Sequence, residues 1–219
     1  MRNAGADMIA YLRALIDAKR GSPDDDMLSA LVLATDEGDR LSPDELISMA
    51  FLLLVAGHET TVNLIGNGAL ALLRHPEVRE RLAADEALWP AAVEEFLRYD
   101  GPVTNATWRF TTEPVRVGSV VIPEGEFVTI SLGAAGRDPR RYEAPDRLDI
   151  TRPRTAGLAF GHGVHHCLGA PLARLEGHVV LSRLFARLPG LRLAVDAGEL
   201  RWRGSLMMRG LEELPVFTA

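Results

Sequence analysis

The stretch from Phe160 to Arg174, FGHGVHHCLGAPLAR, constrains the fold of this chain more than any other part of it. It contains Cys167, the only cysteine among 219 residues, and three glycines stand close to that thiol. Glycine allows tight or left-handed turns, so the stretch predicts a backbone held close to something flat and bulky. The residues after the cysteine open a helix, and the positive end of a helix dipole favours a deprotonated thiolate. Cys167 is therefore predicted to be a metal ligand.

Two other interpretations of this stretch are open from the residues alone. Free cysteine is among the most buried residue types, so one alternative for Cys167 is an inert place in the core. Imidazole and thiolate are also zinc ligands, so the other alternative is a zinc site. Its ligands would be His162, His165, His166 and Cys167. A zinc site would require neither Phe160 nor three glycines, which weighs against it.

The pattern Phe-x-x-Gly-x-His-x-Cys-x-Gly over residues 160–169 resembles the haem-binding loop of the cytochrome P-450 family, the haem-thiolate monooxygenases. The resemblance implies that Cys167 is the proximal ligand of the iron of haem b, and that electron donation from its sulfur favours cleavage of the O–O bond. It also implies that His165 contacts a haem propionate. The residues assigned to haem in this stretch are Phe160, Gly161, His165, Cys167 and Gly169.

A second constraint is a long helix that begins at Ser42-Pro43-Asp44-Glu45, a capping box with proline at the first helical position. No convincing stop occurs before Arg74-His75-Pro76, which predicts a helix of about 30 residues, or roughly 50 Å. Its centre, AGHETT at residues 56–61, is polar. Glycine there costs about 1 kcal/mol relative to alanine, and threonine competes for backbone hydrogen bonds. A local cost without a local gain indicates a function.

The AGHETT segment resembles the oxygen-binding segment in the central helix of cytochromes P-450. The resemblance implies that Glu59 and Thr60 relay protons to dioxygen, while Ala56 and Gly57 leave room for it. Heterolytic cleavage of O–O requires protons from positioned donors, which suits an acid beside an alcohol. The alternative is a long core helix with a polar defect at its centre.

Glu95 and Arg98 stand at positions i and i+3 of a predicted helix, where their side chains can pair. Such pairs are by default solvated and contribute little to stability. The surrounding VEEFLRY, however, resembles the Glu-x-x-Arg helix of the family, in which a buried pair binds an arginine from a later loop. The matching arginine here is Arg152, and the role implied for all three residues is structural support of the Cys167 loop.

The rest of the chain predicts further helices, a small β portion and an irregular segment. Helical spacing of apolar residues predicts helices at about 6–20, 27–32, 76–84, 89–99 and 168–187. Three β-branched runs, at 115–118, 120–122 and 127–132, predict a hairpin around the turn at residues 123–125. Residues 35–40 predict a polar loop, and residues 137–153 a segment with little regular structure.

Arg109 matches a family arginine that pairs with a haem propionate, and the alternative is a surface arginine on a strand. Residues 102–107 and 206–208 match segments that border the substrate pocket. Two positions depart from the family pattern: Gly157 stands where histidine is frequent and Gly136 where asparagine is frequent. The loss of a polar contact at Gly157 would loosen the binding of a propionate.

Composition excludes some classes of function. The net charge of −6 gives no reason to expect a nucleic-acid partner, although basic residues gather between Arg137 and Arg192, where an acidic electron carrier would dock. One cysteine excludes an internal disulfide framework and fits a reducing cytoplasm. The most apolar run, residues 46–57, is shorter than the about 20 residues that a membrane span needs. We therefore expect a cytoplasmic protein without a membrane span.

The expected fold is mainly α with a small β portion, in the cytochrome P-450 architecture of the bacterial soluble type. The resemblance covers residues 1–219 as a single haem-binding domain, but it corresponds to the C-terminal half of a family member and lacks the N-terminal half.

The activity that the resemblance implies is a monooxygenase reaction, in which one atom of O2 enters a small organic substrate. Electrons would come from NAD(P)H through a reductase and a ferredoxin-type donor. The alternative is a truncated, non-catalytic haem-binding fragment, and under either reading a partner is one possible source of the absent half.

Overall fold

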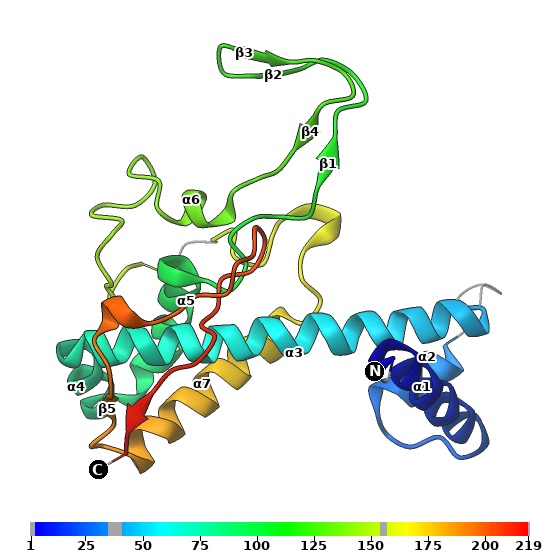
Figure 1. Ribbon diagram of the computed structural model, residues 1–219, viewed down its shortest axis with the longest axis horizontal. Coiled ribbons are helices and arrows are strands. Elements are labelled where there is room, and N and C mark those ends of the chain that lie inside the picture. The colour runs from blue at the N-terminus through cyan, green and yellow to red at the C-terminus, as the bar shows by residue number, and fades with distance from the viewer. Residues whose placement is uncertain (1–2, 35–40, 154–156, 219) are drawn as a thin grey trace. The chain divides into compact units, whose positions relative to one another are not determined.

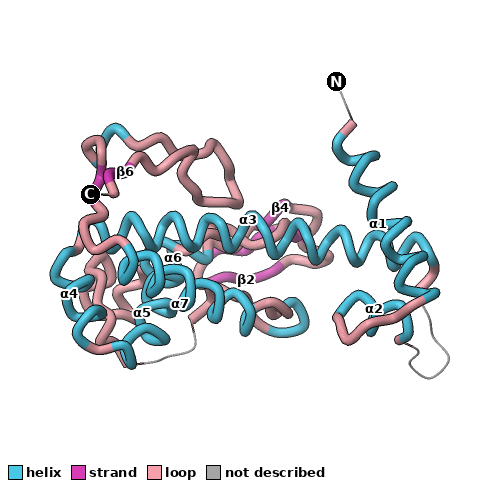
Figure 2. The backbone as a smooth tube through the Cα atoms, turned by 90° about the horizontal axis from the view of Figure 1, so that it is seen from below, coloured by secondary structure: helices cyan, strands magenta, loops and turns pink. Residues whose placement is uncertain are grey.

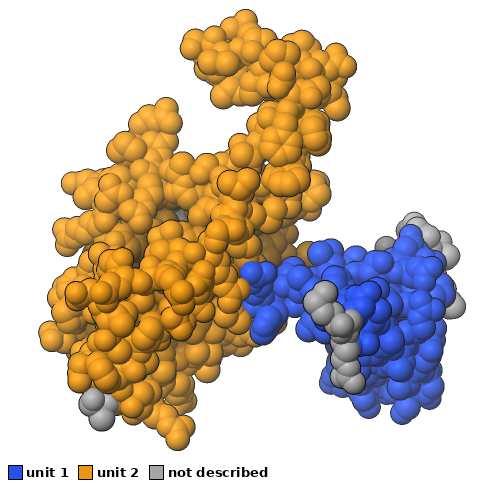
Figure 3. Space-filling view, viewed as in Figure 1, with its two compact units in different colours: residues 1–59 blue, residues 60–219 orange. Residues whose placement is uncertain are grey.

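The computed structural model describes residues 3–34, 41–153 and 157–218. The predicted loop at 35–40 lies outside the described residues. Helices dominate the described part of the chain, and the strands are short, as predicted (Figure 2). The chain divides into two compact units, residues 1–59 and residues 60–219, which Figure 3 colours separately. The long helix α3 (Pro43–Arg74) contributes residues to both units.

The first unit is built from α1 (Ala4–Gly21), α2 (Met27–Leu33) and the beginning of α3. Asp26 caps α2 by accepting a hydrogen bond from the Ser29 amide at 2.8 Å, which satisfies one of the free amide groups of the first turn. The apolar faces of these helices share a small core. Its buried members are Leu12, Ile16, Leu46, Ile47 and Ala50.

Helix α3 begins and ends where the sequence predicts. The Ser42 amide donates to Glu45 Oε2 at 2.8 Å, and the Glu45 amide donates to Ser42 Oγ at 3.3 Å, so both halves of the capping box are formed. Proline at position 76 then prevents continuation beyond His75. By length and composition alone, α3 would fit a membrane span, a test that the long core helices of soluble proteins also pass.

The second unit holds the main hydrophobic core. The C-terminal part of α3 packs there with α4 (Pro76–Ala84), α5 (Trp89–Asp100) and α7 (Ala170–Arg187), and α5 lies against α7 (Figure 1). Short 3₁₀ turns occur at Glu86–Leu88, Gly163–His165 and Ala197–Glu199. Residues that are almost completely buried include Leu64, Leu72, Ala92, Val93 and Leu181. These core residues hold together α3, α5 and α7, the helices next to the candidate site.

The β portion consists of three antiparallel pairs of very short strands among the described residues. β1 (Arg109–Phe110) pairs with β4 (Phe127–Val128), β2 (Val115–Val117) with β3 (Val120–Ile122), and β5 (Arg192–Leu193) with β6 (Val216–Phe217).

The predicted hairpin turn at residues 123–125 is wrong. The hairpin joins β2 to β3 through Gly118, whose φ of +60° suits the tight two-residue turns that twisted strands favour. The predicted run at 127–132 also ends early, since β4 stops at Val128. Residues Leu132–Gly136 form the short helix α6, capped by Ser131 Oγ at 3.2 Å from the Ala134 amide.

The segment 137–153 has little regular structure, as predicted, but polar contacts fix it. Arg137 donates to the Tyr99 carbonyl at 3.1 Å from Nε and to Asp146 at 2.7 Å from Nη1. The Arg140 guanidinium hydrogen-bonds Asp138 and lowers the pKa of that carboxyl from 3.8 to about 2. The contact with Tyr99 attaches the segment to the end of α5, and the other two hold the segment together.

Candidate functional site

The loop that presents Cys167 is held by its own backbone. The Cys167 amide donates to the Phe160 carbonyl at 3.0 Å, and the His166 amide donates to the Gly163 carbonyl at 3.0 Å. Gly161 and Gly163 both have φ of +73°, a left-handed conformation that explains why glycine is needed at these two positions. The chain enters α7 directly after this loop, so the cysteine stands just before the helix N-terminus.

Cys167 is exposed, which excludes the inert core position as its place in this structure. The loop around it exposes large apolar side chains beside its histidines, since Val164 is 98% exposed and Leu168 is 86% exposed. Leu158 and Leu172 are exposed as well. A group of large apolar side chains exposed to solvent marks a surface that binds a ligand or another protein segment. One accessible thiol among exposed apolar side chains is a donor set that fits a flat, apolar macrocycle such as haem.

The histidines of the loop do not form a zinc site in this structure. His162, His165 and His166 are all exposed. Within residues 3–34, 41–153 and 157–218, no three or more His, Cys, Asp or Glu side chains gather in a way that could hold a metal ion. The cluster interpretation therefore lacks geometric support, and His165 is left as a candidate contact for a group bound at Cys167.

Glu95 and Arg98 form a buried, bidentate ion pair on α5. Arg98 Nε and Nη2 each lie 2.7 Å from an oxygen of Glu95, and the two residues are 4% and 9% exposed. Arg152 joins them through Nε at 3.2 Å from Glu95 Oε1. The structure thus brings together the three residues that the sequence predicts to pair. Glu95 and Arg98 are buried and Arg152 is half-buried, unlike the solvated pairs that contribute little to stability.

The same network ties α5 to the irregular segment. Arg98 donates to the carbonyls of Gly136 and Pro145 at 2.8 and 2.7 Å. Arg152 donates to the Glu143 carbonyl at 2.6 Å, and the Asp149 amide donates to Glu95 Oε1 at 2.8 Å. Buried ion pairs offset their desolvation only when hydrogen bonds satisfy the remaining donors, and that condition is met here.

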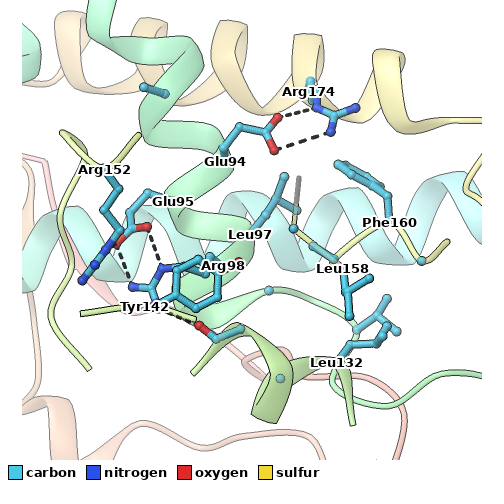
Figure 4. Close-up of a pocket in the computed structure, with 18 of the residues that line it drawn as sticks. Glu94, Glu95, Leu97, Arg98, Leu132, Tyr142, Arg152, Leu158, Phe160 and Arg174 are labelled. Atoms are coloured by element: carbon cyan, nitrogen blue, oxygen red, sulfur yellow. Dashed lines mark hydrogen bonds and ion pairs between the residues drawn. The ribbon is translucent and has the colours of Figure 1, made fainter. Parts of the chain in front are cut away.

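A cavity of about 320 Å³ lies between this network and the Cys167 loop (Figure 4). It is bounded by α5, by α6, by the end of the irregular segment and by residues 157–162 of the loop. Phe160 and Arg98 both line it, so the Cys167 loop and the ion-pair network border the same cavity.

The polar centre of α3 does not interrupt the helix, which is continuous from Pro43 to Arg74. Ala56, Gly57 and Glu59 are exposed in the first unit, and Thr60, the first residue of the second unit, is half-buried. Nothing lies within 4 Å of a Cβ built at Gly57. The small residues therefore leave open space along the helix at this point.

Arg109 lies at the start of β1 and is exposed. Its Nη1 donates to Thr107 Oγ1 at 2.6 Å and to the carbonyls of Thr107 and Trp108 at 3.1 Å. These partners are neighbours in the sequence. The contact of Arg109 with a propionate therefore stays a prediction.

Comparison with known proteins places these features in a family. The model of the cytochrome P-450 family matches residues 1–189. The chain belongs to the cytochrome P-450 family. It is 58% identical over 207 residues to the vitamin D(3) 25-hydroxylase of Pseudonocardia autotrophica, with 94% of this chain and 51% of that protein covered. It is 53% identical over 216 residues to the monooxygenase PikC of Streptomyces venezuelae, with 98% of this chain and 52% of PikC covered.

The fold agrees with solved cytochrome P-450 structures. The ligand-free monooxygenase TamI superposes with a TM-score of 0.95 and 51% identity, over 99% of this chain and 53% of TamI. The mainly α fold with a small β portion is thereby confirmed as a cytochrome P-450 fold. This P-450 chain spans about half the length of the relatives that it matches.

The sequence does not predict the contacts of several polar residues of this P-450 chain. Asn63 and Asn67 are buried on α3, and Asn67 Nδ2 donates to the Asp100 and Arg209 carbonyls at 3.0 Å each. Glu94 of α5 pairs with Arg174 of α7 beside the Cys167 loop. No spacing rule could find these contacts, because the partners come from distant parts of the chain.

Proposed function

We propose that this chain is the C-terminal, haem-binding half of a haem-thiolate monooxygenase. The observation that carries the proposal is the exposed Cys167 in a glycine-turned loop at the start of α7, within a chain of the cytochrome P-450 family. The chain matches about half of each relative, and the resemblance of its late Cys167 loop to the haem-binding loop of the family motivates the assignment to the C-terminal half. We further propose that residues 1–219 belong to a single haem-binding domain, although two compact units are distinguished.

In this proposal Cys167 ligates the iron of haem b, and His165 and Arg109 hold its propionates. Phe160, Gly161 and Gly169 would border the bound haem. When bound, haem supplies the iron at which dioxygen is reductively activated, and a thiolate ligand favours O–O cleavage. The exposed apolar side chains of the loop would then be covered by the macrocycle, which removes apolar surface from water.

Glu59 and Thr60 are proposed to hold and pass the protons that the reaction consumes. Insertion of one oxygen atom into a C–H bond reduces the other atom to water, which requires two electrons and two protons. A carboxyl and a hydroxyl in neighbouring positions are suitable donors when they stand within hydrogen-bond reach of the oxygen. Ala56 and Gly57 provide the space, and nothing lies within 4 Å of a Cβ at Gly57.

Glu95, Arg98 and Arg152 are proposed to act as structural support rather than in chemistry. Their ion pairs and carbonyl contacts fix the segment that faces the Cys167 loop across the cavity. The electrons are proposed to come from NAD(P)H through a reductase and a ferredoxin-type donor. The substrate is proposed to be a small organic molecule, and the protein to be cytoplasmic.

The exposed apolar surface supports a further part of the proposal, that an N-terminal half completes the site. Leu52, Leu54 and Val55 of α3 are all exposed, and each is between 46% and 58% accessible. Such a surface is usually buried in a complete protein. The second candidate function is a non-catalytic haem-binding fragment. It applies if no other segment covers these exposed residues of α3.

The deciding experiment is the absorption spectrum of the haem-loaded chain, reduced and exposed to carbon monoxide, with Cys167→Ala as the matched variant. A strongly red-shifted Soret band that the variant lacks is expected. A chain that takes up no haem, or a spectrum unchanged by the substitution, would overturn the proposal. Iron and zinc contents of the purified chain separate haem from a zinc site. NAD(P)H consumption coupled to product separates the enzyme from the fragment.

A further inference from the structure

Arg174 of α7 lies over the ring of Phe160 in the Cys167 loop. The guanidinium carbon is 4.4 Å from the ring centroid, within the range of a cation–π contact. Glu94 of α5 binds the edge of the guanidinium, with Arg174 Nε and Nη2 both donating to its carboxylate (Figure 4). Arginine suits this place because its planar group can stack on a ring while its edge binds a carboxylate.

Phe160 connects this contact to the thiol. Its ring packs against the main hydrophobic core, and it is half-buried. Its carbonyl accepts the hydrogen bond from the Cys167 amide at 3.0 Å. A displacement of Phe160 would therefore move the acceptor that fixes the backbone of Cys167.

The ion pair by itself is too exposed to matter much for stability. The side chains of Arg174 and Glu94 are 42% and 37% accessible, a range in which a pair is screened by solvent. Two elements separated in the sequence nevertheless converge on one ring of the loop. Such an arrangement is better suited to fixing the position of the ring than to stabilising the whole fold.

We propose that Arg174 is a positioning residue, held by Glu94 against Phe160 so that the loop presents Cys167 in one fixed geometry. Arg174 touches no reacting atom in this role. The inference rests on the proposed function only for what Cys167 binds. The positioning itself is a property of the chain and can be measured without haem.

The test is a double-mutant cycle read by hydrogen exchange of single amides in the 219-residue chain without haem. Its variants are Arg174→Ala, Phe160→Leu and the double variant. Loss of a contact of this kind should speed exchange of the Cys167 amide about two- to fivefold. Phe160→Leu keeps the apolar bulk but removes the aromatic face, so Arg174→Ala should add little in that background. Arg174→Lys should lie between wild type and Arg174→Ala.

The control is Arg183→Ala, which removes an exposed arginine from the same helix and should leave the Cys167 amide unchanged. Exchange of amides within α7 and the thermal unfolding midpoint report whether a variant has merely loosened the fold. If the two single effects on the Cys167 amide are additive, or if Arg174→Ala has no effect there, the inference is overturned. An increase in exchange that is equal throughout α7 would also overturn it.

The failure of this inference is distinguishable from the failure of the proposed function. The exchange cycle uses no haem, whereas the spectrum with Cys167→Ala depends on it. In the haem-loaded chain we expect Arg174→Ala to lower the fraction with a thiolate-type Soret band, and Arg174→Lys to retain more of it. Wild-type haem binding together with an additive cycle would leave the function standing and remove the positioning role.

Discussion

Glu95 and Arg152 are 57 residues apart in the sequence and meet at 3.2 Å, with Arg98 completing the ion-pair network. Glu95 is 4% exposed and is the carboxylate that both guanidinium groups share. A single acidic side chain thus pairs with two arginines and also accepts a hydrogen bond from the Asp149 amide. The attachment of the irregular segment to α5 depends on it.

Glu95→Gln should therefore be strongly destabilising. Removal of one partner from a buried ion pair leaves uncompensated charge, which costs about 3–5 kcal/mol. Chemical denaturation of the chain measures this change in the free energy of unfolding. The exposed Glu80→Gln is the matched control and should change it by less than about 0.5 kcal/mol. Equal effects of the two substitutions would mean that the network does not support the fold.

Gly57→Ala should raise stability while harming the proposed chemistry. Alanine is favoured over glycine in a helix by about 1 kcal/mol, and nothing lies within 4 Å of a Cβ at Gly57. Gly66→Ala, on the same helix and likewise with nothing within 4 Å of an added Cβ, is the matched control. Both variants should unfold at a higher denaturant concentration. In the enzyme completed by its N-terminal half, only Gly57→Ala should lower the amount of product formed per NAD(P)H consumed. An equal ratio of product to NAD(P)H in both variants would contradict a role of Gly57 in dioxygen binding.

Gly163→Ala should strain the Cys167 loop. The φ of +73° at this position is costly for a residue with a Cβ, by about 1–2 kcal/mol. Gly169→Ala serves as the control, because its φ is −80° and its added Cβ would lie at an ordinary 3.8 Å from Cys167 Sγ. Thermal unfolding should show a loss for Gly163→Ala alone. A loss of similar size at both positions would point to crowding of the loop instead of backbone strain.

Acid should remove a stabilising contribution from Asp138. Hydrogen bonds from Arg140 lower its pKa from 3.8 to about 2 in the folded chain. A carboxyl whose pKa is lowered on folding adds stability above the unfolded value, and this is lost as the pH falls through the folded value. The stabilities of wild type and Asp138→Asn should therefore differ above pH 3.8 and converge towards pH 2. A difference that is constant between those two pH values would contradict the contact; Asp25→Asn controls for the loss of one exposed carboxylate.

The position of the turn in the hairpin is a feature that the sequence did not predict correctly. The sequence shows three β-branched runs and predicts the hairpin turn at residues 123–125, where Gly125 has a positive φ of +79°. Two glycine turns compete in this region, and pairing decided in favour of Gly118, because β4 pairs with β1 rather than with β3. Strand pairing joins distant segments, so no local pattern could choose between the turns.

The sequence by itself determined those features whose physical causes are local. The capping box at Ser42 and the proline at position 76 define α3, and glycines with positive φ shape the loop of Cys167. Only the tertiary structure decided other contacts across elements: Asn67 on the Asp100 and Arg209 carbonyls, and Arg174 between Glu94 and Phe160. Helix caps and turns depend on neighbours along the chain, whereas burial and ion pairing depend on which faces the core brings together.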